Sequence, residues 1–182
     1  MFAPFLDCPP PIRAIGRPER PRILAHLLAL DAHDRYLRFG HAASDERIRR
    51  YVDGLNVERD AVFGVFDAGL ALEAFAHLAY SVEARCRPVA EFGVSVLPRA
   101  RGRGLGAQLF DRAVDHARNE GVTLLRVHAL SENATMLRIA QRAGARVERD
   151  GPEAEALLSL PPATFDTRVR EWIDERRAAI DY

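Results

Sequence analysis

The most constraining feature of this sequence is a segment in which an apolar run, a loop of glycine and arginine, and a helical pattern follow one another directly. Residues 89–97 are mostly apolar and alternate like a strand, and the run stops at Pro98, which cannot continue a strand ladder. Three arginines and three glycines then crowd into residues 99–106, and apolar residues recur at helical spacing from Leu105 onward. The segment therefore predicts a strand, a tight loop and a helix in direct succession.

Such a succession is suited to binding an anion. The N–H groups of a first helical turn have no partner within the helix, and the helix dipole adds partial positive charge at that end. Gly102, Gly104 and Gly106 would let a phosphate approach the backbone with no Cβ in the way. Arg101 and Arg103 can add charge-assisted hydrogen bonds. We expect the loop to bind a phosphate or pyrophosphate group.

Two nucleotide motifs can be compared with this loop. A Walker A loop requires a lysine after its glycines, and the chain contains no lysine, so a nucleotide triphosphatase is disfavoured. The dinucleotide pattern G-x-G-x-x-G/A is met by Gly102, Gly104 and Ala107. That pattern requires an acidic residue about 20 residues later, at the end of the next strand. The predicted strand 122–130 carries no carboxylate, so a dinucleotide-dependent oxidoreductase stays only as an alternative hypothesis.

Two segments resemble motifs of the GNAT N-acetyltransferase superfamily. Residues 101–107 resemble its acyl-CoA pyrophosphate loop, Q/R-x-x-G-x-G/A, with Arg101, Gly104 and Gly106 at the motif positions. Residues 133–145 resemble its N-x-x-(M/A)-x-x-(L/I)-x-x-x-x-G-(F/A) helix. The two motifs occur in the family's order with a strand between them. The resemblance covers roughly Ala61 to Leu160.

The resemblance implies transfer of an acetyl or other acyl group from acetyl-CoA to a primary amine, without a metal. It implies that the pantetheine arm lies along the strand before the loop and that a backbone N–H there polarises the thioester. The acceptor would be a small-molecule or protein amine. The residues implied in cofactor binding are Val94, Ser95, Val96, Arg101, Gly102, Arg103, Gly104, Gly106, Ala107 and Asn133.

The general base predicted for this reaction is Glu91. It interrupts an apolar strand, where a carboxylate is costly unless it is paired or serves a purpose, and many GNAT members place a glutamate here. His77 and His128 are rival candidates, because imidazole titrates near neutrality. Ser131 is better explained as a helix cap than as a nucleophile, and Asn133 is suited to be an N-cap as well as a cofactor ligand.

No residue is predicted to act as the general acid that protonates the departing thiolate. Many GNAT enzymes carry a tyrosine in the last motif helix, and the matching residue here is Ala140. Tyr51 or Tyr80 could replace it only if the fold brings one of them to the site. The missing tyrosine also keeps a second hypothesis open, in which a GNAT-like domain binds acyl-CoA as a sensor and does not turn it over.

The periodicity predicts one domain of the α/β (α+β) class with the GNAT fold: a mixed, mostly antiparallel central sheet with helices on both faces. We expect a proline-rich N-terminal extension over 1–21, the acyl-CoA-binding domain over 22–160, and a C-terminal helix over 161–182 that packs on the domain. A homodimer contact is the second possible role of that helix. Helices are predicted over 22–39, 44–55, 105–117, 133–143 and 164–179, and strands over 61–66, 70–81, 89–97, 122–130, 146–149 and 154–160.

Composition restricts the partners. The chain has 26 basic and 26 acidic residues and a net charge of zero, so no bulk charge favours nucleic acid or an acidic membrane. No apolar run approaches the ~20 residues that a membrane span requires. The two cysteines, Cys8 and Cys86, are too few for a disulfide framework, which favours a cytoplasmic protein.

Overall fold

The computed structural model describes residues 10–81 and 88–180. In this part of the chain a seven-stranded sheet runs in the order β1-β2-β3-β4-β5-β7-β6, and every neighbouring pair is antiparallel except β4 and β5. The sheet is thus mixed and mostly antiparallel, as predicted. The strands are β1 (Arg13–Ala14), β2 (Ala61–Phe66), β3 (Leu72–Tyr80), β4 (Val89–Val96), β5 (Leu124–Leu130), β6 (Arg146–Asp150) and β7 (Glu153–Ser159).

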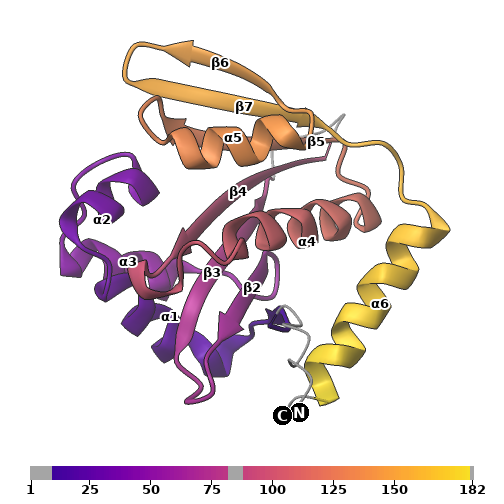
Figure 1. The fold of residues 1–182 in the computed structure, drawn as a ribbon, viewed down its shortest axis with the longest axis horizontal. Helices are drawn as coiled ribbons and strands as arrows, with labels where there is room; N and C mark the ends of the chain where they lie inside the picture. Colours follow the sequence, from indigo (N-terminus) through magenta and orange to yellow (C-terminus); the bar gives the residue numbers. More distant parts are fainter. Residues whose placement is uncertain (1–9, 82–87, 181–182) are drawn as a thin grey trace, which may run out of the picture.

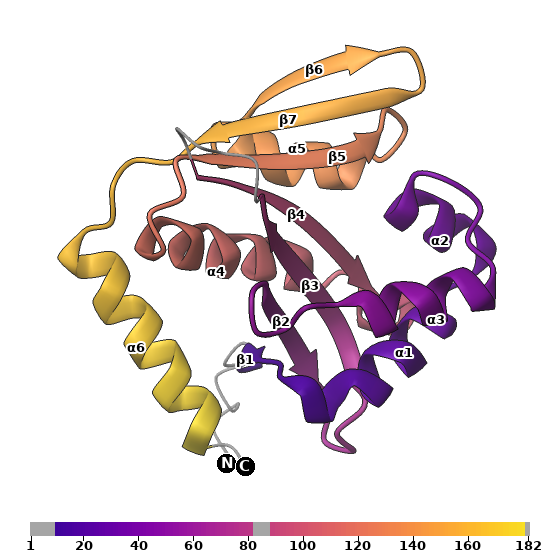
Figure 2. The same cartoon turned by 180° about the vertical axis from the view of Figure 1, so that it is seen from behind.

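Helices cover both faces of this sheet (Figures 1 and 2). The first three lie against one face near β3 and β4, whereas α4 and α5 lie against the other, and α6 runs beside α4. The helices are α1 (Arg20–Leu28), α2 (Ala32–Phe39), α3 (Asp45–Gly54), α4 (Leu105–Asn119), α5 (Ala134–Arg142) and α6 (Phe165–Ile180), with short 3-10 turns η1 (Arg17–Glu19) and η2 (Pro98–Ala100).

Each face of the sheet has its own apolar core. Successive residues of β4 alternate between the two cores, as strand geometry requires. Phe92 packs edge-on against Phe110 of α4 with ring centroids 5.0 Å apart. On the opposite face, Phe75 and Val62 pack with Ile23, Leu27 and Ile48 of the first helices. The side chain of Glu91, and the position where a Cβ of Gly93 would stand, therefore belong to the face that α1, α2 and α3 cover.

The predicted 22–39 helix is wrong in one respect, because it is two helices. Asp31 has extended backbone and its side chain accepts a hydrogen bond from Asp34 N at 2.8 Å, so it caps a new helix, α2. The apolar stripe continues across the break, which is why periodicity alone predicted one helix. Ser44 caps the helix predicted over 44–55, since its side chain accepts a hydrogen bond from Arg47 N at 3.4 Å.

The sheet also takes in part of the proline-rich N-terminal stretch. Arg13 and Ala14 of β1 pair with Gly64 and Phe63 of β2 and extend the sheet by one strand. Ile15 N donates to Val62 O at 2.8 Å and continues this contact. The connection between the predicted strands 70–81 and 89–97 falls almost entirely outside the described residues, as do both cysteines.

The C-terminal helix α6 packs on α4 through polar side chains. Glu171 accepts hydrogen bonds from Arg112 at 2.7 Å and from His116 at 2.6 Å. Burial on its own raises the pKa of Glu171, but hydrogen bonds from His116, Arg112 and Asn119 outweigh it and lower the pKa to about 2. The apolar side of α6, which we expected to face the domain, is instead exposed: Phe165 81%, Trp172 55%, Ile173 48% and Val169 36%.

A buried histidine joins α1 to the sheet. His26 is 2% exposed, its Nδ1 donates to the carbonyl of Leu72 at 2.9 Å, and the Ser95 hydroxyl donates to its Nε2 at 2.8 Å. Burial lowers the pKa of His26 from 6.5 to about 4, against the hydrogen bond to Leu72 O, which raises it. The ring is therefore neutral in the folded protein at neutral pH.

This histidine predicts a loss of stability in mild acid. Between pH 6.5 and about 4 the unfolded chain binds a proton at His26 that the folded protein does not, so the free energy of unfolding falls as pH falls. The shift corresponds to about 3 kcal/mol at most. Urea unfolding from pH 8 to pH 4 should show this loss. His26→Gln should shrink it, and parallel curves for the two proteins would contradict the assignment.

Candidate active site

The strands β4 and β5 separate part of the way along the sheet. Their parallel ladder has only the pairs Val89–Leu124, Ala90–Leu125 and Glu91–Arg126, although β4 continues for five residues beyond Glu91. From there β5 is paired with β7 alone. A cleft of about 480 Å³ opens at this place, lined by residues of α2, β4, β5, β7 and α5.

The backbone of β4 presents polar groups to this cleft. Leu97 N donates to Glu73 O and Ser81 N donates to Val89 O, both at 2.9 Å. In an antiparallel ladder, directly opposed residues that bond in this way alternate with residues that face away. Odd-numbered residues of β4 therefore bond to β3. The N–H and C=O groups of Phe92 and Val94 point the other way, into the cleft.

Of the three strand residues predicted to bind the cofactor, Ser95 is placed differently from its neighbours. Its backbone belongs to the set that bonds to β3, and its hydroxyl donates to His26. The side chain is also buried, at 8% exposed. Ser95 therefore supplies neither a backbone nor a side-chain group to the cleft, whereas Val94 lines it. Sequence reasoning treated the strand as a unit and did not assign the direction of each residue.

The glycine loop ends where α4 begins. Gly102 and Gly104 have φ of +78° and +74°, a left-handed conformation that other residues adopt only with strain. The first intrahelical bond runs from Gln108 N to Gly104 O at 3.1 Å, so the N–H groups of residues 105–107 precede it. A Cβ on Gly102 would meet nothing within 4 Å. The loop thus offers several N–H groups and open space, which fits a phosphate group.

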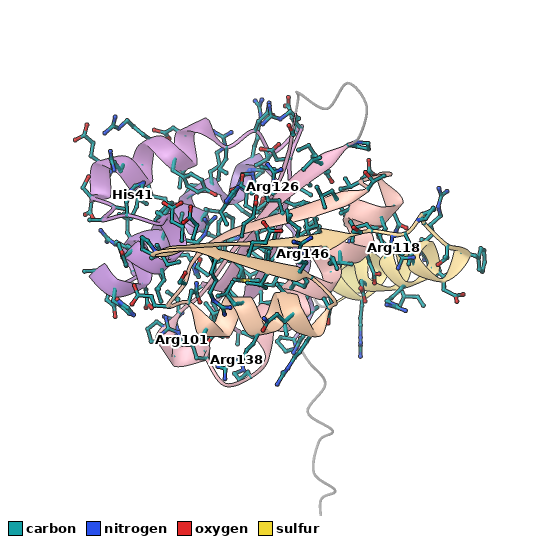
Figure 3. All side chains as sticks on the ribbon, turned by 90° about the horizontal axis from the view of Figure 1, so that it is seen from above. His41, Arg101, Arg118, Arg126, Arg138 and Arg146 are labelled. Atoms are coloured by element: carbon teal, nitrogen blue, oxygen red, sulfur yellow. The ribbon has the colours of Figure 1, made fainter. Side chains whose placement is uncertain are left out.

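The loop arginines have partners within the protein. Arg101 Nη2 lies 2.6 Å from a carboxylate oxygen of Asp34, which is 8% exposed, and its Nε donates to the carbonyl of Val96 at 3.2 Å. Arg103 Nη1 donates to Glu73 at 2.7 Å. Figure 3 shows Arg101 on one side of the sheet and His41, at the end of α2, on the other. The loop arginines are therefore oriented by carboxylates before any ligand arrives.

The second motif borders the cleft through α5. The side chain of Asn133 accepts from Met136 N at 3.2 Å, which confirms it as an N-cap, and both residues line the cleft. Ser131 is not a helix cap: its hydroxyl donates to the carbonyls of Gly151, in the turn before β7, and of Glu153, the first residue of β7. Ala140, at the position where many relatives have tyrosine, is fully buried.

The predicted base, Glu91, lines the cleft at the last rung of the β4–β5 ladder. The sequence suggested a carboxylate immersed in an apolar strand, but the side chain is exposed, because the strands separate just beyond it. His128 also lines the cleft, with its side chain 55% exposed and its Nε2 3.6 Å from Glu155. Glu91 and His128 thus lie on neighbouring strands of the same opening.

The other rival base, His77, belongs to a chain of hydrogen bonds. Its Nε2 donates to Asp60 at 3.0 Å, the Tyr51 hydroxyl donates to its Nδ1 at 3.0 Å, and Arg38 Nη2 donates to the Tyr51 oxygen at 3.0 Å. Burial is the main cause that lowers the pKa of His77, aided by the charge of Arg38. Burial raises the pKa of Asp60, but hydrogen bonds from Arg59 and His77 outweigh it, and the net shift is downward.

Tyr80 is not brought to the cleft. It packs against the core cluster on the α4 face, and its oxygen has no hydrogen-bond partner among the described residues. Burial raises the pKa of Tyr80, and the nearby carboxylates of Glu120, Glu171 and Asp60 raise it further. Tyr51, the other candidate acid, lies on the α1–α3 side and is engaged with His77 and Arg38.

Sequence reasoning missed Arg38 and Asp60. They are 55 and 17 positions from Gly93 and His77 along the chain, and no local pattern joins them. One signal was present in the strand itself. A glycine inside a strand often marks the close approach of another group. A Cβ on Gly93 would lie 2.8 Å from Arg38 Nη1.

No group of three or more His, Cys, Asp or Glu side chains in the described part of the chain could hold a metal ion. None of the helices within residues 10–81 and 88–180 is both long and apolar enough to cross a membrane.

Comparison with known proteins gives a family match and a shared fold. The model of the Acetyltransferase (GNAT) family matches residues 28–145. No curated protein sequence matches this chain. The fold is similar to the GNAT domain of S. lividans PAT, with a TM-score of 0.67 and 18% identity over 82% of this chain and 89% of that one.

Two further solved structures share the fold. One is a GNAT superfamily phosphinothricin acetyltransferase from Sinorhizobium meliloti in complex with AcCoA (TM-score 0.67, 13% identity, 86% of this chain and 91% of that chain). The other is the spermidine N-acetyltransferase from Vibrio cholerae in complex with CoA and spermine (TM-score 0.62, 19% identity, 81% and 94%). At these identities the similarity shows the fold alone, and it confirms the predicted fold class.

Proposed function

Because this chain belongs to the GNAT acetyltransferase family, we propose that it transfers an acetyl group from acetyl-CoA to a primary amine by direct attack. The observation that carries the proposal is the end of the β4–β5 ladder at Glu91. Beyond it, the backbone groups of Phe92 and Val94 point into the cleft that opens between β4 and β5. Solved neighbours with the same fold contain CoA or acetyl-CoA.

In this proposal different residues bind different parts of acetyl-CoA. The N–H groups of residues 105–107, with Gly102, Gly104 and Arg101, hold the pyrophosphate. Arg103, Gly106 and Ala107 complete the loop. The backbone groups of β4 hold the pantetheine arm, and Asn133 and Met136 border it on α5.

The chemistry requires a free amine and an oriented carbonyl. Acetyl-CoA supplies the acetyl group as a thioester; the new bond joins the amine nitrogen to the carbonyl carbon, and the C–S bond breaks. Glu91 takes the proton from the amine, directly or through a water, and a β4 backbone N–H polarises the carbonyl. The sulfur leaves as a thiolate and takes up a proton, for which the structure offers no tyrosine at Ala140.

The test of this function has two parts. Calorimetry with acetyl-CoA, CoA and NAD(P) separates an acyl-CoA protein from the dinucleotide alternative. A panel of amines with acetyl-CoA and detection of released thiol then tests transfer. Release of thiol that depends on an amine supports the proposal. Tight binding of acetyl-CoA without release under any amine would favour the sensor hypothesis, which the buried Ala140 also supports.

The neighbours do not select an acceptor. Their names include acetyltransferases of spermidine, of phosphinothricin and of ribosomal-protein alanine, which differ widely in charge and size. The proposed domain covers residues 22–160, preceded by the proline-rich extension and followed by the C-terminal helix, and the proposed compartment is the cytoplasm.

A homodimer through α6 is the proposed assembly. Phe165, Val169, Trp172 and Ile173 are exposed on one side of this helix, and a second copy offers the same apolar stripe. We expect light scattering to give a dimer mass that Trp172→Glu reduces to that of a monomer. Arg168→Glu, an exposed position on the same helix, is the control and should not change the mass. A monomeric wild-type protein would contradict the assignment.

A further inference from the structure

Arg38 is a cation that lines the cleft and has no ion-pair partner in the described part of the chain. Its Nη2 donates to Tyr51, and its Nε is buried without a hydrogen bond. Across residues 10–81 and 88–180, no carboxylate forms a salt bridge with it. A partly buried charge without a counter-ion is costly, and proteins usually pair it. A bound anionic ligand would supply the missing counter-charge.

Several groups of the protein hold the Arg38 guanidinium in place. Gly93 provides the space for it, since a Cβ there would lie 2.8 to 2.9 Å from three guanidinium atoms. The rings of Phe39 and Tyr51 lie 5.3 and 5.6 Å from its carbon. Asp60 orients His77, His77 orients the Tyr51 hydroxyl, and the Tyr51 oxygen accepts from Arg38. Tyr51, His77 and Asp60 are thus positioning residues for Arg38.

The position of Arg38 separates it from the pyrophosphate loop. Gly93 is five residues before Pro98, a distance of about 16 Å along an extended strand. A Cβ on Gly93 would point to the face of the sheet that α1, α2 and α3 cover, whereas α4 lies on the opposite face. Arg38 lines the same cleft as Glu91. Glu91 precedes Gly93 by two residues and lies on the same face of β4, so the Cα atoms of these two residues are about 7 Å apart. One anion-binding group and one proton acceptor therefore lie side by side.

A neighbouring cavity differs from the cleft in charge, because the cleft carries Arg38 together with Glu91 and Glu153, whereas arginine supplies the only charged side chains that line this cavity. It has a volume of about 270 Å³ and is lined by Phe39, His41, Ala43, Arg47, Arg50 and Tyr51, with no carboxylate in its wall. It shares Phe39 and His41 with the cleft. A polycationic acceptor would meet arginines here, whereas an acceptor that carries an acidic group would be attracted.

We propose that the acceptor is a small amine that carries a carboxylate close to the amine, as an amino acid does, and that Arg38 binds this carboxylate. The guanidinium is suited to it, because its planar fork binds carboxylates through two parallel hydrogen bonds. The bound carboxylate places the amine at Glu91, the proposed proton acceptor. This inference rests on the proposed transfer reaction and adds the class of its acceptor.

The test compares amino acids with their uncharged counterparts. The common L-amino acids, β-alanine and γ-aminobutyrate are each paired with the carboxamide, and spermidine is added as a polycation. Thiol release at saturating acetyl-CoA gives kcat/KM for each acceptor. We expect the best acid to exceed its carboxamide by about 10- to 100-fold, the range for hydrogen bonds to a charged group. Equal use of an acid and its amide, or preference for spermidine, would overturn the inference while leaving transfer intact.

Three variants locate the effect at Arg38. Arg38→Met should bring the acid-to-amide ratio close to one, and Arg38→Lys should restore part of the ratio. Arg49→Met is the control, because Arg49 is exposed on α3 and lines neither cavity. Thermal melts show whether each variant folds, and the wild-type comparison stands without them. An unchanged ratio in a folded Arg38→Met would contradict the inference.

A binding measurement separates this inference from the transfer reaction. Calorimetric titration of the CoA-loaded protein with the same amino acids detects the carboxylate contact without turnover. Binding that requires Arg38 in a protein that releases no thiol would support the site and reject the transfer function. No binding and no preference for acids would reject the site, whatever the activity.

Discussion

Glu91→Gln is expected to lower kcat/KM by about 10²- to 10⁴-fold, the usual contribution of a general base. The substitution keeps the shape of the side chain at the mouth of the cleft and removes its ability to accept a proton. An alkyl amine is almost wholly protonated at neutral pH, so the reaction must first remove that proton. Raising the pH should recover part of the loss, because more of the acceptor is then deprotonated in solution. Steady-state kinetics with the best acceptor measures the effect.

Acetyl-CoA affinity, measured by calorimetry, should barely change in this variant, because Glu91 is remote from the loop. Glu153→Gln is the matched comparison: Glu153 is another exposed glutamate of the same cleft, on β7. It removes an equal charge without removing the proposed base, and its effect should be far smaller. Near-full activity of Glu91→Gln would make Glu91 structural. In that case His77 and His128 are the next residues to replace.

Gly104→Val is expected to weaken acetyl-CoA binding by at least about tenfold, since the loss of one hydrogen bond to a charged group is already of that size. Gly104 is the N-cap residue of α4, with φ of +74°. A branched side chain there blocks the approach of a phosphate and strains the backbone. The strain alone should lower the free energy of unfolding by about 1–2 kcal/mol. Calorimetry gives the affinity, and urea unfolding gives the stability.

Gly121→Val separates the two effects. Gly121 has φ of +77° just after the other end of α4, and a Cβ there would meet nothing within 4 Å. The control therefore carries the same backbone strain far from the loop. We expect it to lose similar stability and to keep the acetyl-CoA affinity. Equal affinities in the two variants would remove the glycine loop from the binding site.

The strands and most helices could be predicted from the sequence because their periods are local. The strand predicted over 61–66 is β2 to the residue, and helix α4 begins at the predicted position. The break at Asp31 was missed because one capping hydrogen bond, rather than any change in apolar spacing, ends α1 and begins α2. The spacing of apolar residues does not reveal where such a capping hydrogen bond divides a helix.

The orientation of side chains between elements could not be predicted in the same way. The apolar stripe of α6 suggested a packed face, but α4 presents Arg112, His116 and Asn119, so the carboxylate of Glu171 turns inward instead. The position of the Arg38 side chain likewise could not be predicted, because its guanidinium lies against Gly93, which is far away along the chain. The glycine loop could be predicted from the sequence because its residues are consecutive. The surroundings of Arg38 could not, because they are assembled from separate helices and strands.

The ion pair between Asp34 and Arg101 has a consequence for how the two substrates influence each other. Asp34 and Arg38 are one helical turn apart on α2, so a single helix contacts both the phosphate loop and the acceptor side. A phosphate that engages Arg101 competes with Asp34 and alters what holds α2 in place. Occupancy of the two sites is then coupled, and thermodynamic linkage makes the coupling reciprocal. We therefore expect the binding of either substrate to change the affinity for the other.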